Sequence, residues 1–304
     1  MSHWSKIEES GFILGMEFLL KVHLWFGRRI LQIFLYPVVS YYWIINKEGR
    51  KASRDYLLKI ANYSSDQSIN GGLLCSYKHF IVFANALIDK VAVWSGDFRL
   101  NDLEYHGREA IINHCNENQG LLLLGSHLGN LDVCRAIAAV RKNIVINVLL
   151  HTQHSEKFNA LLNKYAESTR IELIEVSTIS PETVMRLQDK IEAGELVIIA
   201  ADRTPVSGGY RVSRVGFFEQ LASFPQGPFI LASLLKCPVY TVFCLRKKNK
   251  HVIYFDHFSN QLFFSRKNRT EEIQKSVQVY AGRLQQYCIE EPLQWFNFYD
   301  FWRT

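Results

Sequence analysis

A histidine and an aspartate stand five positions apart in the stretch GSHLGNLD, residues 125–132. His127 follows the apolar run Leu121–Leu124, and catalytic groups of open α/β sheets gather beyond the carboxyl ends of strands. An aspartate behind an imidazole holds the ring in one tautomer and stabilises its protonated form. His127 and Asp132 are therefore candidates for a general base that takes a proton from a hydroxyl or an amine.

This pairing makes a demand on the backbone between the two residues. Positions i and i+5 of one helix lie about 140° apart, so a continuous helix would not pair the side chains. The pair requires His127 in a turn and Asp132 in the first helical turn. Gly129 accepts unusual dihedral angles and Asn130 can cap a helix, which makes such a turn feasible.

Two other interpretations concern the same stretch. Gly125-Ser126-His127-Leu128-Gly129 comes close to the G-x-S-x-G elbow of serine hydrolases. The apex of such an elbow would be His127, however, and Ser126 would point the other way. In the plainer interpretation His127 is a turn residue and Asp132 is a solvated acid favoured by the helix dipole. The spacing alone does not exclude this second interpretation.

A second strand end carries polar residues in the segment 200–240. An apolar run leads into Asp-Arg, and a basic loop that contains glycine follows. The next apolar helix can offer N-terminal backbone N–H groups to an anion, and an arginine cluster could hold a phosphate or neutralise an oxyanion. An ordinary salt bridge between the aspartate and an arginine is the alternative. The candidates are Asp202, Arg203, Arg211, Arg214 and Gly227.

Apolar patterning predicts the elements that position these residues. After about residue 95, short apolar runs alternate with helical segments, which is typical of an α/β fold with a mostly parallel sheet flanked by helices. The short link Arg246–Lys250 predicts an antiparallel hairpin, so the sheet should be mixed. Strands are expected at Leu121–Leu124, Ile144–Leu150, Ile171–Val176, Leu196–Ala201, Val239–Leu245 and His251–Phe258. Helices are expected at Gly11–Tyr36, Lys47–Ala61, Leu73–Trp94, Leu131–Val140, Glu156–Ser168, Pro181–Ala193, Pro228–Leu235 and Thr270–Ile289.

The N-terminal part of the chain is unusually apolar and aromatic. Its longest uncharged run, Ile30–Asn46, is shorter than the roughly 20 residues of a membrane span and is flanked by basic residues. This pattern favours a kinked segment in the bilayer interface, with a true span or a buried hairpin as alternatives. We expect a helical, membrane-associating segment at residues 1–95 and an α/β domain at 96–304, together forming one structural unit.

Composition and short motifs limit which binding partners and which metal or cofactor sites the chain can have. A net charge of +6 fits an anionic partner such as acidic lipid or an acidic carrier protein, and no nucleic-acid-binding signature is present. Six scattered cysteines without a C-x-x-C pair indicate buried thiols in a reducing compartment. His151 and His154 lack a nearby third ligand, so no metal site is expected, and dinucleotide and P-loop fingerprints are absent.

Taken in order, the motifs resemble those of the bacterial lipid A lauroyl/myristoyl acyltransferases, within the lysophospholipid and glycerol-phosphate acyltransferase superfamily. The resemblance spans roughly residues 120–302. It rests on His127-(x4)-Asp132, Ala201-Asp202-Arg203, VGFFEQLASFPQGPFILA at 215–232 and EPLQWFNFYDFW at 291–302. The N-terminal part looks like a divergent branch, of the kind found in glycolipid, ornithine-lipid or aryl-polyene pathways.

The resemblance implies an O- or N-acyltransferase that moves a fatty acyl chain from acyl carrier protein or coenzyme A to a lipid or glycolipid acceptor. No cofactor beyond this acyl thioester co-substrate is implied, and no covalent enzyme intermediate forms. His127, Asp132 and Arg203 would be catalytic, and Asn130, Asp202, Arg211, Arg214 and Gly227 would lie on the substrate side. The expected place is the cytoplasmic face of the bacterial inner membrane, with peripheral or single anchoring.

Two departures from the family pattern matter. Lipid A enzymes usually carry glutamate where Asp132 stands, and they have a clearer N-terminal transmembrane helix. Both departures put lipid A precursor in doubt as the acceptor. A lipid or thioester hydrolase that activates water with the same base, and a lipid-binding protein without catalysis, are the alternatives.

Overall fold

The computed structural model describes residues 22, 33, 35–64, 68–94, 103–134, 144–150, 171–175, 180–204, 211–248 and 250–303. The helix expected at Glu156–Ser168, most of the one expected at Gly11–Tyr36 and the pair His151 and His154 lie outside these residues.

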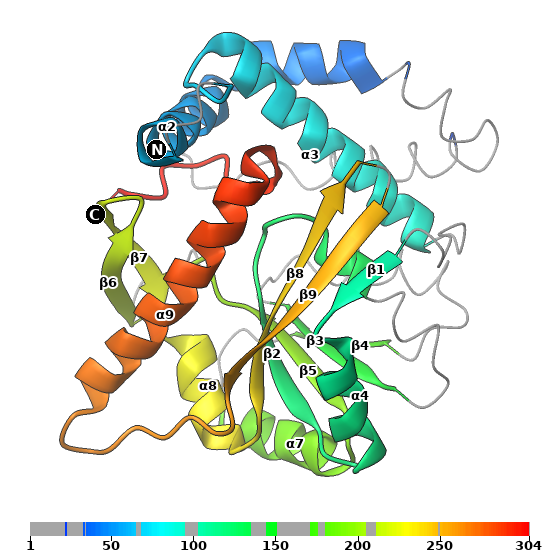
Figure 1. Cartoon of the computed structure of the whole chain (residues 1–304), viewed down its shortest axis with the longest axis vertical. Coiled ribbons are helices and arrows are strands. Elements are labelled where there is room, and N and C mark those ends of the chain that lie inside the picture. The colour runs from blue at the N-terminus through cyan, green and yellow to red at the C-terminus, as the bar shows by residue number, and fades with distance from the viewer. Residues whose placement is uncertain are drawn as a thin grey trace.

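A seven-stranded sheet forms the centre of the molecule, with the strand order β1-β9-β8-β2-β5-β3-β4 (Figure 1). Neighbouring strands are parallel except β8 and β9, which form an antiparallel hairpin. The mixed, mostly parallel sheet of an α/β fold is thus confirmed. The strands are β1 (Leu103–His106), β2 (Leu121–Gly125), β3 (Ile146–Leu150), β4 (Ile171–Glu175), β5 (Leu196–Ala200), β8 (Val239–Lys247) and β9 (Lys250–Ser259).

Helices cover both faces of the sheet and one of its ends. The α7, α8 and α9 helices contribute to the apolar cluster on one face, and α4 contributes to the cluster on the other. In Figure 1, α3 and the helix at 35–45 run across the end of the sheet where β2 and β8 finish, and α2 lies beside them. The bounds are α2 (Lys47–Ser64), α3 (Leu73–Trp94), α4 (Arg108–Asn116), α7 (Pro181–Glu192), α8 (Gly227–Leu235) and α9 (Arg269–Glu290).

Strand β2 explains why an unbroken leucine run marks the centre of the sheet. Successive strand side chains point to opposite faces, and here both faces are covered. Leu122 and Leu124 join the cluster with α9, whereas Leu121 and Leu123 join the cluster with α4. None of the four side chains is more than 2% exposed, so β2 is fixed from both sides and holds its carboxyl end in place.

Two parts of the fold were not predicted from sequence. One is the β1–α4 unit, which adds an edge strand parallel to β9. The other is an antiparallel hairpin of β6 (Val212–Phe217) and β7 (Gln220–Pro225), in the segment interpreted as a basic loop. Along β6 the exposed and buried residues alternate, and the buried ones pack among the aromatic side chains of the core.

The turn after β2 depends on a glycine. Gly129 has a φ of 70°, and a side chain there would collide with the backbone carbonyl of Cys244 in β8. That closeness lets the N–H of Asn130 donate to the same carbonyl at 2.9 Å. Gly129 itself donates to the carbonyl of Gln294 at 2.7 Å, so the turn is tied to β8 and to the C-terminal tail.

Within the described part of the chain, the helices fall short of the combined length and apolarity that crossing a membrane requires.

Replacing Gly129 by alanine should destabilise the fold by about 2 kcal/mol or more, because left-handed strain adds to the collision with Cys244. Gly282→Ala is the matched control: it lies in α9 with nothing within 4 Å of a new Cβ, and should stabilise by about 0.5 kcal/mol. Urea unfolding measures both changes. Equal stability of the two variants would contradict the tight approach at Gly129.

Candidate active site

The structure pairs His127 with a carboxylate from the neighbouring strand. His127 lies just beyond β2, and Asp202 lies just beyond β5, which pairs with β2 in parallel. The Nδ1 atom of His127 is 2.8 Å from Oδ1 of Asp202, and the backbone N–H of His127 donates to Oδ2 at 2.9 Å. Carboxyl ends of adjacent parallel strands meet at one edge, and this brings together two residues 75 positions apart.

The tautomer of His127 follows from these contacts. A carboxylate only accepts hydrogen bonds, so Nδ1 carries the proton and Nε2 keeps its lone pair. The His127 side chain is 37% exposed, whereas that of Asp202 is fully buried. No described residue forms a hydrogen bond to Nε2. The ring is thus partly exposed and is held from behind by a buried anion, which is the geometry of a general base.

The charges around the pair set its ionisation. Burial, together with the positive charges of Arg203 and Lys90, lowers the pKa of His127 despite the opposing effect of Asp202. Burial alone would raise the pKa of Asp202, but the charge and hydrogen bonds of His127 and the charge of Arg203 bring it below its usual value. At neutral pH the pair thus consists of a neutral imidazole and an anionic carboxylate.

Arg203 is anchored to the C-terminal tail. Its Nε donates to Oδ1 of Asn297 at 2.7 Å, and an Nη atom donates to the carbonyl of Phe296 at 2.6 Å. The guanidinium carbon lies 5.9 Å from the centre of the Tyr299 ring. Burial lowers the pKa of Arg203 from that of a free guanidinium, although the charge still affects His127. Arg203 is thus a fixed cation beside the base.

The C-terminal tail packs into the core beside this site. Three of its aromatic side chains, Trp295, Phe296 and Phe301, belong to the core, and none of them is more than 8% exposed. Leu128 and Trp295 form an antiparallel bridge, and the N–H of Phe296 donates to the carbonyl of His127 at 3.1 Å. The tail therefore forms one wall of the site.

The other predicted residues near His127 have defined backbone positions. Asp132 lies in a short 3-10 helix, Leu131–Cys134, but its side chain is outside the described part, so its pairing with His127 stays a prediction. Ser126 is 4% exposed, and its hydroxyl accepts from the N–H of Leu128, which fits a structural role. Asn130 is buried, and its amide donates to the carbonyl of Ala86 in α3.

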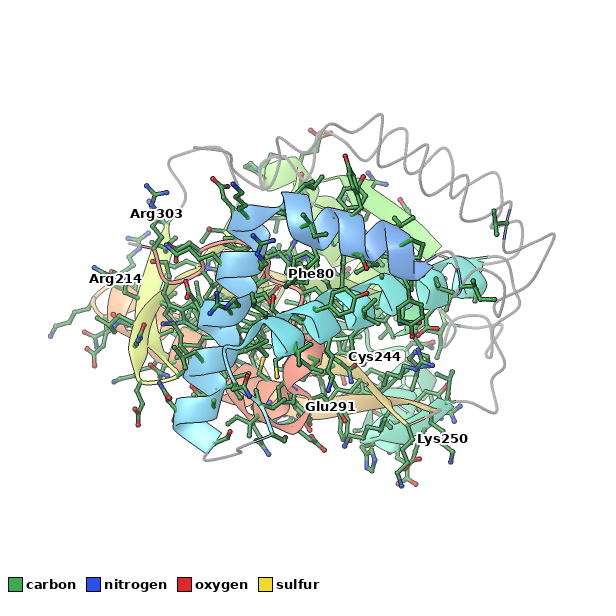
Figure 2. All side chains as sticks on the ribbon, turned by 90° about the horizontal axis from the view of Figure 1, so that it is seen from above. Phe80, Arg214, Cys244, Lys250, Glu291 and Arg303 are labelled. Carbon is green, nitrogen blue, oxygen red and sulfur yellow. The ribbon has the colours of Figure 1, made fainter. Side chains whose placement is uncertain are left out.

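The remaining candidates lie on or beside the β6–β7 hairpin, which packs against α9. Arg211 and Arg214 are exposed, and Figure 2 shows Arg214 at the outer edge of the molecule. Gly227 begins α8, after Gln226, whose N–H donates to the carbonyl of Arg211 at 3.0 Å. The hydrogen bonds that join Asp202 and Arg203 to the tail and to His127 do not involve these three residues.

Two important residues were missed by reading the sequence. The indole of Trp295 donates to Oδ2 of Asp202 at 3.0 Å, and the imidazole of His79 lies 3.0 Å from the carbonyl of Trp295. Neither shows a local signal, because each acts on a residue more than 90 positions away. A buried tryptophan, whose N–H needs an acceptor, was the available hint.

Comparison with known proteins identifies the family to which the chain belongs. The family of bacterial lipid A biosynthesis acyltransferases matches residues 77–304. The chain belongs to this family, and its activity is acyl transfer in lipid biosynthesis, with an acyl donor and a lipid acceptor. A search of curated proteins finds no match. The family was identified correctly from the motifs, and the match begins within α3, so α2 lies before it.

Acid should weaken the fold through His79. Burial lowers its pKa from 6.5 to about 4, against the opposing hydrogen bond to Trp295. Between these values the unfolded chain binds a proton that the folded chain does not, so the free energy of unfolding rises with pH. Keeping His79 neutral contributes about 3 kcal/mol to the free energy of unfolding at pH 7. This contribution is lost as the pH falls from about 6.5 to 4.

Urea unfolding between pH 4.5 and 7.5 measures this dependence. His79→Gln lacks the titrating group, so its free energy of unfolding should rise less steeply with pH over this range. The pH dependence that His127 adds is the same in the wild type and the variant. Identical slopes would contradict the assignment of a neutral, buried His79.

Proposed function

We propose that the protein transfers a fatty acyl chain from acyl carrier protein or coenzyme A to a hydroxyl or amine of a lipid or glycolipid, with His127 as the general base. The observation that carries this proposal is the 2.8 Å contact between Nδ1 of His127 and Asp202, which leaves Nε2 open to substrate. The membership in an acyltransferase family supplies the class of reaction.

In the proposed reaction, Nε2 of His127 takes the proton of the acceptor group as its oxygen or nitrogen attacks the thioester carbonyl. A carbon–oxygen or carbon–nitrogen bond forms, and the carbon–sulfur bond then breaks. The imidazolium proton passes to the departing thiolate, so His127 and Asp202 return to their starting state. Thiolate leaves readily, and no strong general acid or covalent enzyme intermediate is needed.

Arg203 has a supporting role in this proposal. The oxygen of the thioester carbonyl becomes negative in the tetrahedral intermediate, and a fixed cation in a partly desolvated site stabilises such charge. The two hydrogen bonds from Arg203 to the tail fix the guanidinium before substrate arrives. The charges of Arg203 and Lys90 also favour an anionic donor or acceptor, which fits the phosphate of a carrier-protein prosthetic group or of coenzyme A.

Replacement of the base should abolish transfer. Purified protein is incubated with labelled acyl carrier protein or acyl coenzyme A and a bacterial lipid extract, and the labelled products are separated. His127→Ala and Asp202→Asn should each lower the rate of labelled lipid formation by about two to four orders of magnitude. Asp202→Asn acts through the tautomer, because an amide donates to Nδ1 and leaves the proton on Nε2.

Asp132→Asn resolves which carboxylate serves the base. A loss equal to that of Asp202→Asn would give Asp132 the catalytic role predicted from spacing, and a loss below tenfold would assign the role to Asp202. Free fatty acid as the sole labelled product would replace transfer by hydrolysis. A lipid-binding protein without catalysis would give no labelled product with wild type and would bind lipid equally after His127→Ala.

We propose further that the helix at 35–45 docks the enzyme on the membrane surface. Val38, Tyr41, Tyr42 and Ile45 follow the i, i+3, i+4, i+7 spacing of one helix face, and all are more than 50% exposed. Leu35 and Val39 of the same helix are buried and pack in the cluster that contains Phe80 of α3, labelled in Figure 2. An exposed apolar face next to the basic residues that follow it suits an anionic bilayer.

The double variant Tyr41→Glu/Ile45→Glu should therefore bind phosphatidylglycerol-containing vesicles at least about tenfold more weakly in sedimentation, because two apolar side chains no longer enter the interface. Met185→Glu is the control: Met185 is 66% exposed on α7, at the opposite end of the molecule from the helix at 35–45 (Figure 1). A weakening shared by the control, or absent from both, would contradict this docking face.

A further inference from the structure

The indole of Trp295 completes the coordination of the buried carboxylate. Its Nε1 donates to Oδ2 of Asp202 at 3.0 Å, and the same oxygen accepts from the backbone N–H of His127 at 2.9 Å. The other oxygen of Asp202 faces Nδ1 of His127. Three N–H groups thus hold a carboxylate that has no exposed surface, and two of them act on the oxygen that does not face the imidazole.

Trp295 has little freedom to move away from Asp202. The ring is fully buried and meets Tyr56, Phe217 and Phe301 edge to face, with centroids 5.0, 5.3 and 4.8 Å away. Its backbone bridges to Leu128 beside the base. The indole N–H is consequently fixed in direction, as a group that orients a catalytic side chain must be.

His79 extends this arrangement to the N-terminal helices. Its Nε2 lies 3.0 Å from the carbonyl of Trp295, and its Nδ1 lies 3.0 Å from the hydroxyl of Ser53 in α2. A carbonyl only accepts, so Nε2 donates and Nδ1 accepts from the hydroxyl. Ser53, His79, Trp295 and Asp202 are all fully buried. A continuous chain of hydrogen bonds therefore runs from α2 through α3 and the tail to His127.

We propose that Trp295 is a positioning residue for the His127–Asp202 pair, and that His79 and Ser53 hold Trp295 in place. This inference rests on the proposed role of His127 as the base. The indole N–H orients the carboxylate so that Oδ1 meets Nδ1, and it also withdraws electron density from the carboxylate. The base strength of His127 thus depends on a residue of the tail.

The hydrogen bond from the indole of Trp295 weakens the base His127. Without the indole donor, the carboxylate carries more of its charge toward His127, and an imidazolium beside it is better stabilised. Among the described residues, the charged groups that act on His127 are Asp202 and Arg203 from the end of β5 and Lys90 from α3. None of these is altered by changing Trp295, so loss of the indole N–H should raise the pKa of His127.

Trp295→Phe and Trp302→Phe form a matched pair of variants. Trp302 belongs to the same aromatic group, 6.1 Å from Trp295, but its indole donates to the backbone carbonyl of Phe217 at 3.2 Å. Both substitutions remove an indole donor and shrink a packed ring. Only Trp295→Phe removes a donor from Asp202, so an effect shared by the two variants reports loss of ring packing, and an effect confined to Trp295→Phe reports the lost hydrogen bond.

The readouts are the pKa of His127 from histidine-selective NMR, with His127→Ala to identify its signal, and the pH dependence of acyl transfer. Trp295→Phe should raise the pKa by about one unit, shift the acidic limb of the rate profile upward equally, and lower kcat about 10- to 100-fold with KM little changed. Trp302→Phe should leave the pKa in place. An unmoved pKa in Trp295→Phe, or the same shift in both variants, would overturn the proposal.

His79 supplies a second, independent test. His79→Gln keeps an amide donor for the carbonyl of Trp295 and should retain the pKa of His127, whereas His79→Leu should move it in the direction of Trp295→Phe. Equal pKa values in the two His79 variants would remove His79 from the proposed chain. Because the NMR readout needs no turnover, a pKa shift in a protein without acyl transfer would refute only the proposed function.

Discussion

The buried carboxylate of Asp202 is the constraint around which the rest of the structure is arranged. An anion without solvent is costly unless it is fully hydrogen-bonded. The backbone and ring of His127 and the indole of Trp295 meet this requirement from two separate parts of the chain. The pairing of β2 with β5 places Asp202 beside His127, and the C-terminal tail places the indole of Trp295 beside the same carboxylate. A single electrostatic requirement thus connects the central sheet and the C-terminal segment.

Much of the sheet could be predicted because its signals are local. Unbroken apolar runs mark β2 and β8 as buried on both faces. The link after β8 is too short for a crossover, so β8 and β9 must form an antiparallel hairpin. The edge unit β1–α4 escaped prediction, because β1 is short and only partly buried, with alternate residues exposed. The β6–β7 hairpin was hidden because Gly208, Gly209 and Arg211 directly precede it and suggested a loop, although the alternation of Ser213, Val215 and Phe217 was present in the sequence.

The site itself was only half visible in the sequence. His127 could be recognised from its place after a strand, and Asp202 from a second strand end. Their direct contact could not, because it depends on β5 lying next to β2, and a spacing of five residues drew attention to Asp132 instead. Trp295 and His79 could not be assigned at all, since each works through a partner brought near only by the fold.

The position of Trp295 along the chain has a consequence for biosynthesis. Chains emerge from the ribosome with the N-terminal end first, so His127 and Asp202 appear long before the indole that stabilises them. Until the tail is made and packed, the carboxylate of Asp202 lacks the hydrogen bond from Trp295, and the turn at Gly129 lacks its hydrogen bond to Gln294. The nascent chain therefore passes through a stage in which β2 and β5 can pair but the hydrogen bonds around Asp202 are incomplete. Completion of the site becomes one of the last events of folding.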